Sequence, residues 1–229
     1  MTGQTVVVAI DGPAGSGKSS VSRAIARRRS YGYLDTGAAY RAMAWLGISR
    51  GINPDDPDQV ESLCASFSYR QETDPEHFRA WVAQTDVTAA IRTPEVSGRV
   101  SAYSAVPRVR AELIARFRAL IAAETRDGIV VEGRDITTVV APDATVRVLL
   151  TASPEARARR RAGQRGDAEV ARVAAALAAR DAKDSSVTSF LTAAPGVTVL
   201  DTSDLNFEQS VTALDALIEQ TIRSTEEIA

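Results

Sequence analysis

Short runs of apolar residues alternate along this chain with longer stretches in which apolar residues recur every three or four positions. The short runs predict buried strands, and the longer stretches predict amphipathic helices. Because the two patterns alternate, the chain is typical of the α/β class, in which helices flank a parallel sheet. We predict five strands in one sheet: residues 5–10, a short segment that ends near Leu34, and residues 128–132, 145–151 and 197–201.

The helical pattern predicts eight helices, and three of them begin with a proline. Pro94, Pro107 and Pro154 stand at the first helical position, where the missing N–H of proline costs no hydrogen bond. No stretch approaches the length of about 18 apolar residues that a membrane span needs, and the N-terminus lacks the pattern of a secretion signal. The predicted helices cover residues 18–29, 36–50, 58–65, 94–104, 107–126, 154–162, 168–182 and 207–225.

The pattern changes between residues 61 and 101. Two short alternating segments, 67–71 and 79–83, are separated there by a polar turn. We interpret residues 61–101 as an inserted subdomain with a small antiparallel sheet, and residues 1–60 and 102–229 as the core domain. A glycine-bounded segment at residues 163–167 further predicts a mobile flap within a short lid of about residues 157–168.

The composition is that of an ordinary globular protein. The chain has 229 residues, of which 45% are hydrophobic and 24% are charged, and its formal net charge is -2. This balance excludes a disordered chain and argues against a general nucleic-acid binder. The single Cys64 excludes an internal disulfide, and with only one histidine, His77, no Cys/His cluster has metal-ligand spacing. We expect a cytoplasmic monomer that binds neither membrane nor nucleic acid.

The strongest motif lies between the first predicted strand and the first predicted helix. It matches the phosphate-binding pattern G-x-x-x-x-G-K-[ST] in both sequence and context. Glycines allow successive backbone N–H groups to turn inward around a phosphate, and the helix N-terminus adds its positive partial charge. Lys18 is expected to bridge β- and γ-phosphate oxygens, and the Ser19 hydroxyl is expected to face Mg²⁺. The motif predicts a P-loop NTPase fold that binds a nucleoside triphosphate through Gly12, Pro13, Ala14, Gly15, Ser16, Gly17, Lys18, Ser19 and Ser20.

Two large classes of P-loop protein do not fit the rest of the chain. A GTPase needs an Asp-x-x-Gly motif and an Asn-Lys-x-Asp motif, and neither occurs here. A motor or AAA-type ATPase needs an apolar strand that ends in Asp-Glu, whereas the strand at residues 129–131 is followed by Glu132-Gly-Arg-Asp135. We therefore favour a kinase that acts on a small molecule.

Two further segments carry the polar residues that an acceptor site needs. Thr36 and Tyr40 follow the second predicted strand, share one helical face and are accompanied by Arg41. Arg134 and Asp135 follow a buried strand at its carboxyl end, where ligands bind in open parallel sheets. A cytosine ring offers an amino donor and two acceptors, so a carboxylate, an arginine and a hydroxyl would form a matching set.

Together these segments resemble the bacterial-type cytidylate kinase family of the P-loop nucleoside monophosphate kinase superfamily. The resemblance covers nearly the whole chain and is most specific at Glu132-Gly-Arg-Asp-Ile-Thr-Thr-Val-Val140 and at Arg180-Asp-Ala-Lys-Asp184. It also includes residues 91–93 and 101–110. The resemblance implies Mg²⁺-dependent phosphoryl transfer from ATP to CMP or dCMP, and an insert that binds the nucleoside monophosphate. Because the acceptor phosphate is already ionised, this reaction requires no general base.

The resemblance also implies roles for individual residues. The cytosine would be read by Ser101, Arg110 and Asp135, and the sugar by Arg180 and Asp184. The acceptor phosphate would be held by Arg41 and Arg134, with Thr36 and Tyr40 in the same pocket, whereas Arg157 and Arg161 would face the donor. The implied catalytic residues are Lys18, Arg134 and Arg161, and the implied metal-binding residue is Ser19.

Two departures keep other functions open at this point. Val187 stands where the family usually has an arginine near the base, and Thr137 stands where a glycine is usual. The first alternative is another small-molecule kinase of the same fold, such as a shikimate- or gluconate-type enzyme. The second is an ATP-binding regulator in which CMP turnover is lost or weak because of Val187.

Overall fold

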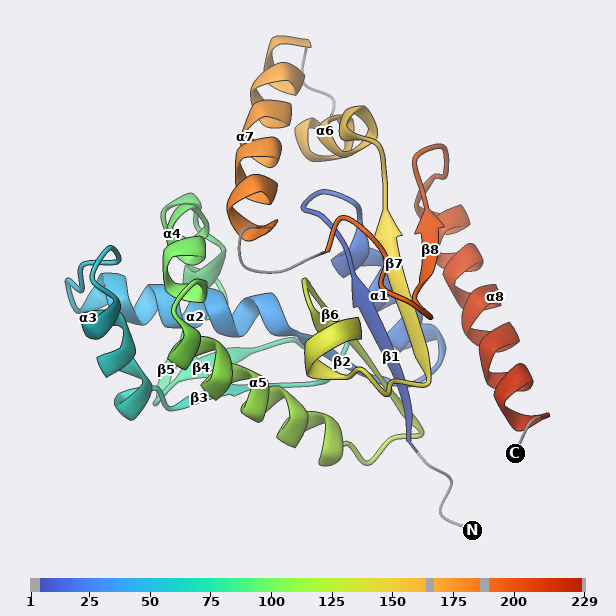
Figure 1. Cartoon of the computed structure of the whole chain (residues 1–229), viewed down its shortest axis with the longest axis horizontal. Helices are drawn as coiled ribbons and strands as arrows, with labels where there is room; N and C mark the ends of the chain where they lie inside the picture. The colour runs from blue at the N-terminus through green and yellow to red at the C-terminus, as the bar shows by residue number, and fades with distance from the viewer. Residues whose placement is uncertain (1–4, 164–166, 186–189, 228–229) are drawn as a thin grey trace. The chain divides into compact units, whose positions relative to one another are not determined.

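A five-stranded parallel sheet forms the centre of the computed structural model, which describes residues 5–163, 167–185 and 190–227. The strand order is β2-β6-β1-β7-β8, so the first strand lies in the middle of the sheet (Figure 1). The prediction of an α/β fold with a five-stranded parallel sheet is confirmed. The strands are β1 (Val6–Asp11), β2 (Gly32–Asp35), β6 (Gly128–Gly133), β7 (Val146–Thr151) and β8 (Thr198–Asp201).

The helices follow the predicted pattern closely. The helices α4 and α6 have the predicted bounds, whereas α5 ends four residues earlier than expected, because the chain has already turned toward β6. The predicted helix at residues 58–65 is α3 followed by a 3-10 turn at Leu63–Ser66. The helices are α1 (Lys18–Arg28), α2 (Thr36–Ser49), α3 (Pro57–Ser62), α4 (Pro94–Ser104), α5 (Pro107–Ala122), α6 (Pro154–Ala162), α7 (Asp167–Ser185) and α8 (Phe207–Glu226). No helix among the described residues is long and apolar enough to cross a membrane.

The chain divides into two compact units, Met1–Tyr33 with Glu124–Ala229 and Leu34–Ala123. The second unit contains the three-stranded antiparallel sheet of β3 (Tyr69–Gln71), β4 (Ala80–Val82) and β5 (Thr85–Asp86). Both residues of β5 are exposed, so no apolar pattern marks this strand in the sequence. The unit is wider than the insert of residues 61–101 because α2 packs against α4 within it.

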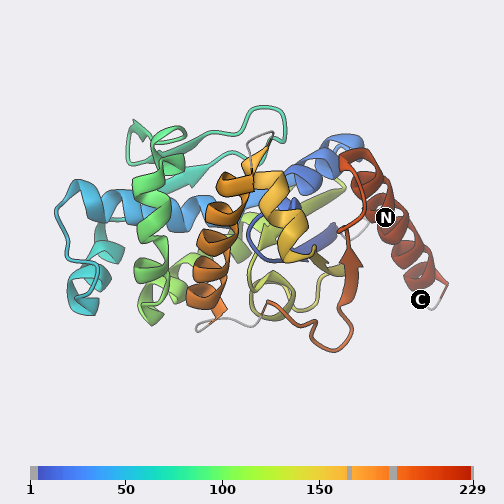
Figure 2. The same cartoon turned by 90° about the horizontal axis from the view of Figure 1, so that it is seen from above.

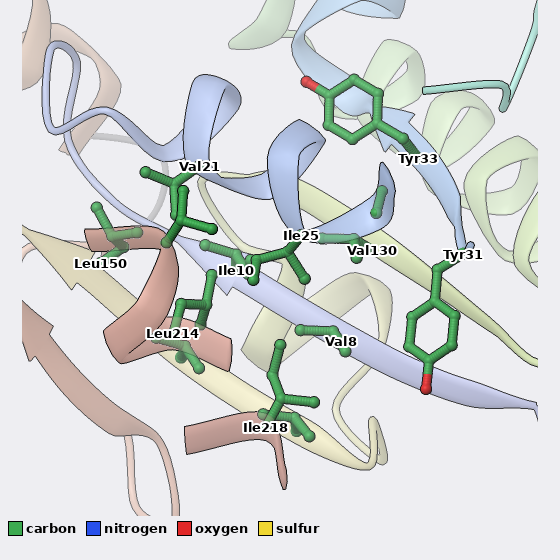
Figure 3. Close-up of a cluster of buried hydrophobic side chains, with 14 residues drawn as sticks. Val8, Ile10, Val21, Ile25, Tyr31, Tyr33, Val130, Leu150, Leu214 and Ile218 are labelled. Atoms are coloured by element: carbon green, nitrogen blue, oxygen red, sulfur yellow. The ribbon is translucent and has the colours of Figure 1, made fainter. Parts of the chain in front are cut away.

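The core of the first unit fixes the place where the P-loop ends and α1 begins. Figure 3 shows Ile10 of β1, Ile25 of α1 and Leu214 of α8 pointing toward one another. All three side chains have no exposed surface, and burial of a side chain of this size contributes about 1.5–3 kcal/mol. The first turn of α1 is therefore held at the carboxyl end of β1.

The helices α6 and α7 pack side by side in the same unit, as Figure 2 shows. The helix α6 begins directly after β7, where the Ser153 hydroxyl accepts a hydrogen bond from the backbone N–H of Ala156 at 3.2 Å and Pro154 occupies the first turn. The start of α6 is thus fixed at the carboxyl end of the sheet, beside the P-loop.

Candidate functional site

The P-loop follows a path that only glycine permits at two positions. A Cβ atom at Gly12 would lie 2.2 Å from the backbone oxygen of Leu150, so a larger residue cannot pass β7 at this point. Gly17 has a φ of 94° and caps the N-terminus of α1 in the left-handed conformation. The glycines at these positions therefore bring the loop close to the sheet and start the helix directly at Lys18.

A pocket of about 450 Å³ opens at this loop. Its volume lies within the range of about 300–1,000 Å³ that is usual for small-molecule sites. The structure brings together here six of the residues that the sequence predicted for ATP, together with Arg161 of α6. The lining residues are Gly15, Ser16, Gly17, Lys18, Ser19, Ser20 and Val21 of the loop and α1, Arg160 and Arg161 of α6, and Leu205, Asn206, Phe207 and Ser210 at the start of α8.

Glu132 connects the two chemically important side chains of the P-loop. Its carboxylate accepts a hydrogen bond from the Ser19 hydroxyl at 2.6 Å and lies 3.8 Å from the Lys18 ammonium group. The Tyr33 hydroxyl donates a further hydrogen bond to it at 3.1 Å. Glu132 is only 3% exposed, and three polar partners compensate for the burial of its carboxylate.

The sequence reasoning placed Glu132 at the end of a buried strand and in the family motif but gave it no role in this site. The signal that could have found it is topological. Because β6 lies next to β1, Glu132 pairs in register with Ile10, two residues before the P-loop starts. The pairing of β6 with β1 therefore places Glu132 beside the beginning of α1, where it bonds Ser19.

Ser19 and Glu132 supply the ligand types that Mg²⁺ prefers, a hydroxyl oxygen and a carboxylate oxygen. Within the described ranges, no group of three or more His, Cys, Asp or Glu residues could hold a metal ion. A magnesium ion bound by one carboxylate usually completes its shell with substrate phosphates and water. The residues present therefore fit a magnesium ion that arrives together with a nucleotide.

A second cluster of charged residues joins α6 and α7 to Gly12 and Ala14 at the start of the P-loop. The guanidinium group of Arg134 donates to the carbonyl oxygen of Gly12 at 2.7 Å and to the carboxylates of Asp181 at 3.2 Å and Asp184 at 2.8 Å. Arg157 donates to the carbonyl oxygen of Ala14 at 3.1 Å and to the Asp181 carboxylate. Two predicted phosphate ligands, Arg134 and Arg157, are thus brought together by an aspartate that the sequence reasoning did not single out.

The remaining predicted residues of this unit lie near the same cluster. Arg180 pairs with Asp184 at 3.8 Å on one face of α7. Asp135, which is 5% exposed, directly follows Arg134 and precedes the π-helical turn at Ile136–Val140.

Arg160 is a pocket residue that helical spacing did not suggest. The arginines expected to face the donor were Arg157 and Arg161, which lie four residues apart on one helix. Arg160 instead donates to the carbonyl oxygens of Ser16 at 2.9 Å and Leu205 at 3.0 Å. It therefore links the P-loop to the segment that begins α8, a contact that depends on packing rather than on local sequence.

Asp11 and Thr137 form a buried pair beneath the P-loop. The Asp11 carboxylate accepts hydrogen bonds from the Thr137 hydroxyl at 2.6 Å and from the backbone N–H groups of Ile136 at 2.7 Å and Thr137 at 3.0 Å. Burial raises the pKa of Asp11, and the hydrogen bonds from Thr137 and Ile136 oppose that rise. The pair fixes the backbone that immediately follows Asp135.

The other predicted acceptor residues belong to the second unit. Asp35 caps α2 by accepting the N–H of Ala38 at 2.9 Å, and its carboxylate pairs with Arg41 at 2.8 Å and with Arg92 at 3.5 Å. Tyr40 packs against Phe117 with ring centroids 6.0 Å apart.

Thr36 stands at the first position of α2 and is 3% exposed, whereas Ser101 on α4 and Arg110 on α5 are half-buried. The predicted acceptor residues are therefore divided between the two units, and their common role in binding a nucleotide stays a prediction.

Comparison with known proteins identifies the family. The family model described as Cytidylate kinase matches residues 8–220. The chain belongs to the cytidylate kinase family.

Curated relatives agree with this membership. The chain is 47% identical over 216 residues to a cytidylate kinase of Streptomyces avermitilis, covering 94% of this chain and 93% of that protein. It is 43% identical over 228 residues to a cytidylate kinase of Cutibacterium acnes, covering 97% of this chain and 100% of that protein.

A solved gluconokinase from Sinorhizobium meliloti 1021 superimposes with a TM-score of 0.51 at 14% identity, covering 100% of this chain and 99% of that structure. At this identity the likeness shows the fold alone, so the gluconate-type alternative gains no support from it.

The two departures from the cytidylate kinase pattern have different outcomes in the structure. The Thr137 side chain takes a defined place, because its hydroxyl bonds the Asp11 carboxylate. Val187 and residues 164–166 of the predicted flap lie outside the described residues. The effect of Val187 on base binding and the movement of the flap therefore stay predictions.

Proposed function

We propose that this chain transfers the γ-phosphoryl group of ATP to the phosphate of CMP or dCMP and releases ADP and CDP or dCDP. The observation that carries the proposal is the arrangement of Lys18, Ser19 and Glu132 beside a pocket of about 450 Å³, in a chain that belongs to the cytidylate kinase family. The working form that we propose is a cytoplasmic monomer.

The donor side of the reaction rests on positively charged groups around the P-loop. Lys18 and the backbone N–H groups at the start of α1 would bind the β- and γ-phosphates. Arg161, which lines the same pocket, would stabilise the charge that spreads over the migrating phosphoryl group. Phe207 and Leu205 supply the apolar surface of the pocket on which an adenine ring would rest.

Magnesium is the cofactor that fits the donor set. Ser19 and Glu132 would hold it, and when bound it would neutralise phosphate charge during transfer. Before any ligand arrives, Glu132 already orients the Ser19 hydroxyl and balances the Lys18 charge. The chain therefore organises both groups in advance of the reaction.

The acceptor side would use a phosphate oxygen of CMP as the nucleophile. That oxygen forms a bond to the γ-phosphorus while the bond from phosphorus to the oxygen of ADP breaks, so no proton needs to be removed from the acceptor. Arg134 would hold the acceptor phosphate, and Asp135 would accept a hydrogen bond from the cytosine amino group. Uracil presents a carbonyl oxygen at that position, which a carboxylate repels.

A coupled assay of ADP release tests the proposal, with ATP, Mg²⁺ and one acceptor at a time: CMP, dCMP, UMP, AMP, GMP, gluconate or shikimate. We expect turnover with CMP and dCMP well above that with the other nucleotides. Release that is greatest with gluconate or shikimate, or that does not depend on any acceptor, would contradict it.

The variant Asp135→Ala should mainly reduce the CMP-to-UMP preference, because Asp135 is buried at the end of β6 beside Arg134. The exposed Asp143→Ala offers a matched control that should leave the preference unchanged.

A further inference from the structure

Asp181 of α7 has a carboxylate that is almost fully buried against the P-loop. Only 5% of the residue is exposed. One carboxylate oxygen accepts the backbone N–H of Ala14 at 3.1 Å and the guanidinium of Arg134 at 3.2 Å, and the other accepts the guanidinium of Arg157. Three donors, from the residue after β6, from α6 and from the P-loop, therefore converge on one side chain.

Each of the two arginines also bonds the P-loop itself. Arg134 donates to the carbonyl oxygen of Gly12 at 2.7 Å, and Arg157 donates to the carbonyl oxygen of Ala14 at 3.1 Å. Both guanidinium groups are thus held between a loop carbonyl and the Asp181 carboxylate. All of these contacts lie within the first compact unit.

The neighbouring Asp184 is placed differently. Its side chain is 12% exposed, against 7% for that of Asp181, and it pairs with Arg134 and Arg180. Asp181 takes the Ala14 N–H, so this N–H is already bonded and is not left for a phosphate. Asp181 is therefore an aspartate that bonds the loop backbone, whereas Asp184 bonds Arg134 and Arg180.

Arg157 retains a donor for a ligand. Its Nε atom is buried and has no hydrogen-bond partner among the described residues. A buried donor without a partner is unfavourable until a ligand supplies an acceptor. A guanidinium group matches the oxygens of carboxylates and phosphates, and of these two a nucleotide supplies phosphate.

We propose that Asp181 is a positioning residue for phosphoryl transfer, which orients Arg134 and Arg157 at the P-loop before the nucleotides bind. The proposal rests on the proposed function, because it assigns both arginines to phosphates. An arginine side chain loses rotamer entropy when it is fixed, and prior fixation removes this cost from the reaction. Asp181 acts through the arginines and does not itself contact the substrates.

The test compares kcat and KM of Asp181→Asn with those of the wild type. We expect kcat to fall about 10- to 100-fold, as misplacement of a catalytic group by about 1 Å can do, while the KM for ATP changes less than threefold. Glu169→Gln is the matched control, because Glu169 is an ion-paired acid on the same helix, bonded to Arg172 at 2.8 Å. This control should retain wild-type kcat.

A double-mutant cycle separates positioning from a purely structural role. Because Asp181 acts through Arg157 and Arg134, the loss of kcat that Asp181→Asn causes should be smaller in the Arg157→Gln background than in the wild type, and the remaining loss is the part that acts through Arg134. Independent, multiplicative losses, or a kcat of Asp181→Asn within threefold of the wild type, would overturn the proposal. If Asp181→Asn does not fold, Asp181→Glu keeps the charge but displaces it by one methylene, and a wild-type kcat in that variant would overturn the proposal as well.

Wild-type measurements distinguish this proposal from the proposed function. If the wild type does not phosphorylate CMP, the proposed function fails. The kcat of the Asp181 variants is then compared with that of the wild type, using the acceptor that does support turnover. If the wild type phosphorylates CMP but the Asp181 variants retain kcat, only the positioning role fails.

Discussion

Replacing Thr137 by valine removes one hydroxyl group from a buried site and leaves nearly the same side-chain shape. Thr137 is 2% exposed and Asp11 is 3% exposed, so water cannot replace the lost donor. The hydroxyl lies 2.6 Å from the Asp11 carboxylate. A hydrogen bond to a charged group contributes about 1.5–3 kcal/mol, and we therefore expect the free energy of unfolding to fall by about 2 kcal/mol. For a chain of this length that corresponds to a decrease in Tm of about 4–8 °C.

The loss should depend on pH, because it acts on the charge of Asp11. Burial raises the pKa of Asp11 above the ordinary value for an aspartate, and the Thr137 hydrogen bond opposes the rise. The folded state therefore binds the proton more tightly than the unfolded state, and stability falls as the pH rises from about 4 through the folded pKa. Without the hydroxyl the folded pKa rises further. The difference between Thr137→Val and the wild type should thus be larger at pH 7.5 than at pH 4.5.

Urea unfolding followed by circular dichroism at the two pH values measures both effects. Thr138→Val is the matched control, since Thr138 is the exposed neighbour in the same turn, and its stability should stay within about 0.5 kcal/mol of the wild type. Thr137→Ser, which keeps the hydroxyl, should recover most of the loss. Equal stability of Thr137→Val and wild type at pH 7.5, or a deficit that grows as the pH falls, would refute the reasoning.

Three further substitutions test the P-loop directly. Lys18→Ala should lower kcat about 10³-fold or more in the coupled assay, whereas Lys183→Ala, which changes the only other lysine of the sequence, should leave kcat unchanged. A Lys18→Ala rate above a tenth of the wild-type rate would exclude Lys18 from the mechanism. Glu132→Gln should raise the Mg²⁺ concentration needed for half-maximal activity about 10- to 100-fold, because it neutralises the carboxylate bonded to the Ser19 hydroxyl. An unchanged Mg²⁺ dependence would argue against Glu132 as a magnesium ligand. Gly12→Ala should destabilise the protein by more than about 2 kcal/mol, because its Cβ would meet a backbone oxygen at 2.2 Å. Gly98→Ala, whose Cβ would meet open space within α4, should stabilise it by about 0.5–1 kcal/mol, and similar melting temperatures for the two variants would contradict this account of the loop.

Local pattern was sufficient for most of the elements. The bounds of α4 and α6 follow from a proline at the first position and from apolar spacing, both of which act within one or two helical turns. The strand β5 escaped prediction because its two exposed residues carry no apolar pattern. It exists through its pairing with β4, which is a tertiary contact.

The P-loop, the class of ligand and the family were determined by the sequence alone, because a phosphate cradle is built from consecutive backbone groups whose geometry depends on local residue types. The partners of that loop were decided by the tertiary structure. Glu132 meets Ser19 across 113 positions only because β6 lies beside β1, and Asp181 meets Ala14 across 167 positions only because α7 packs with α6 at the sheet's carboxyl end. Such contacts depend on strand order and helix packing, which no local pattern along the chain encodes.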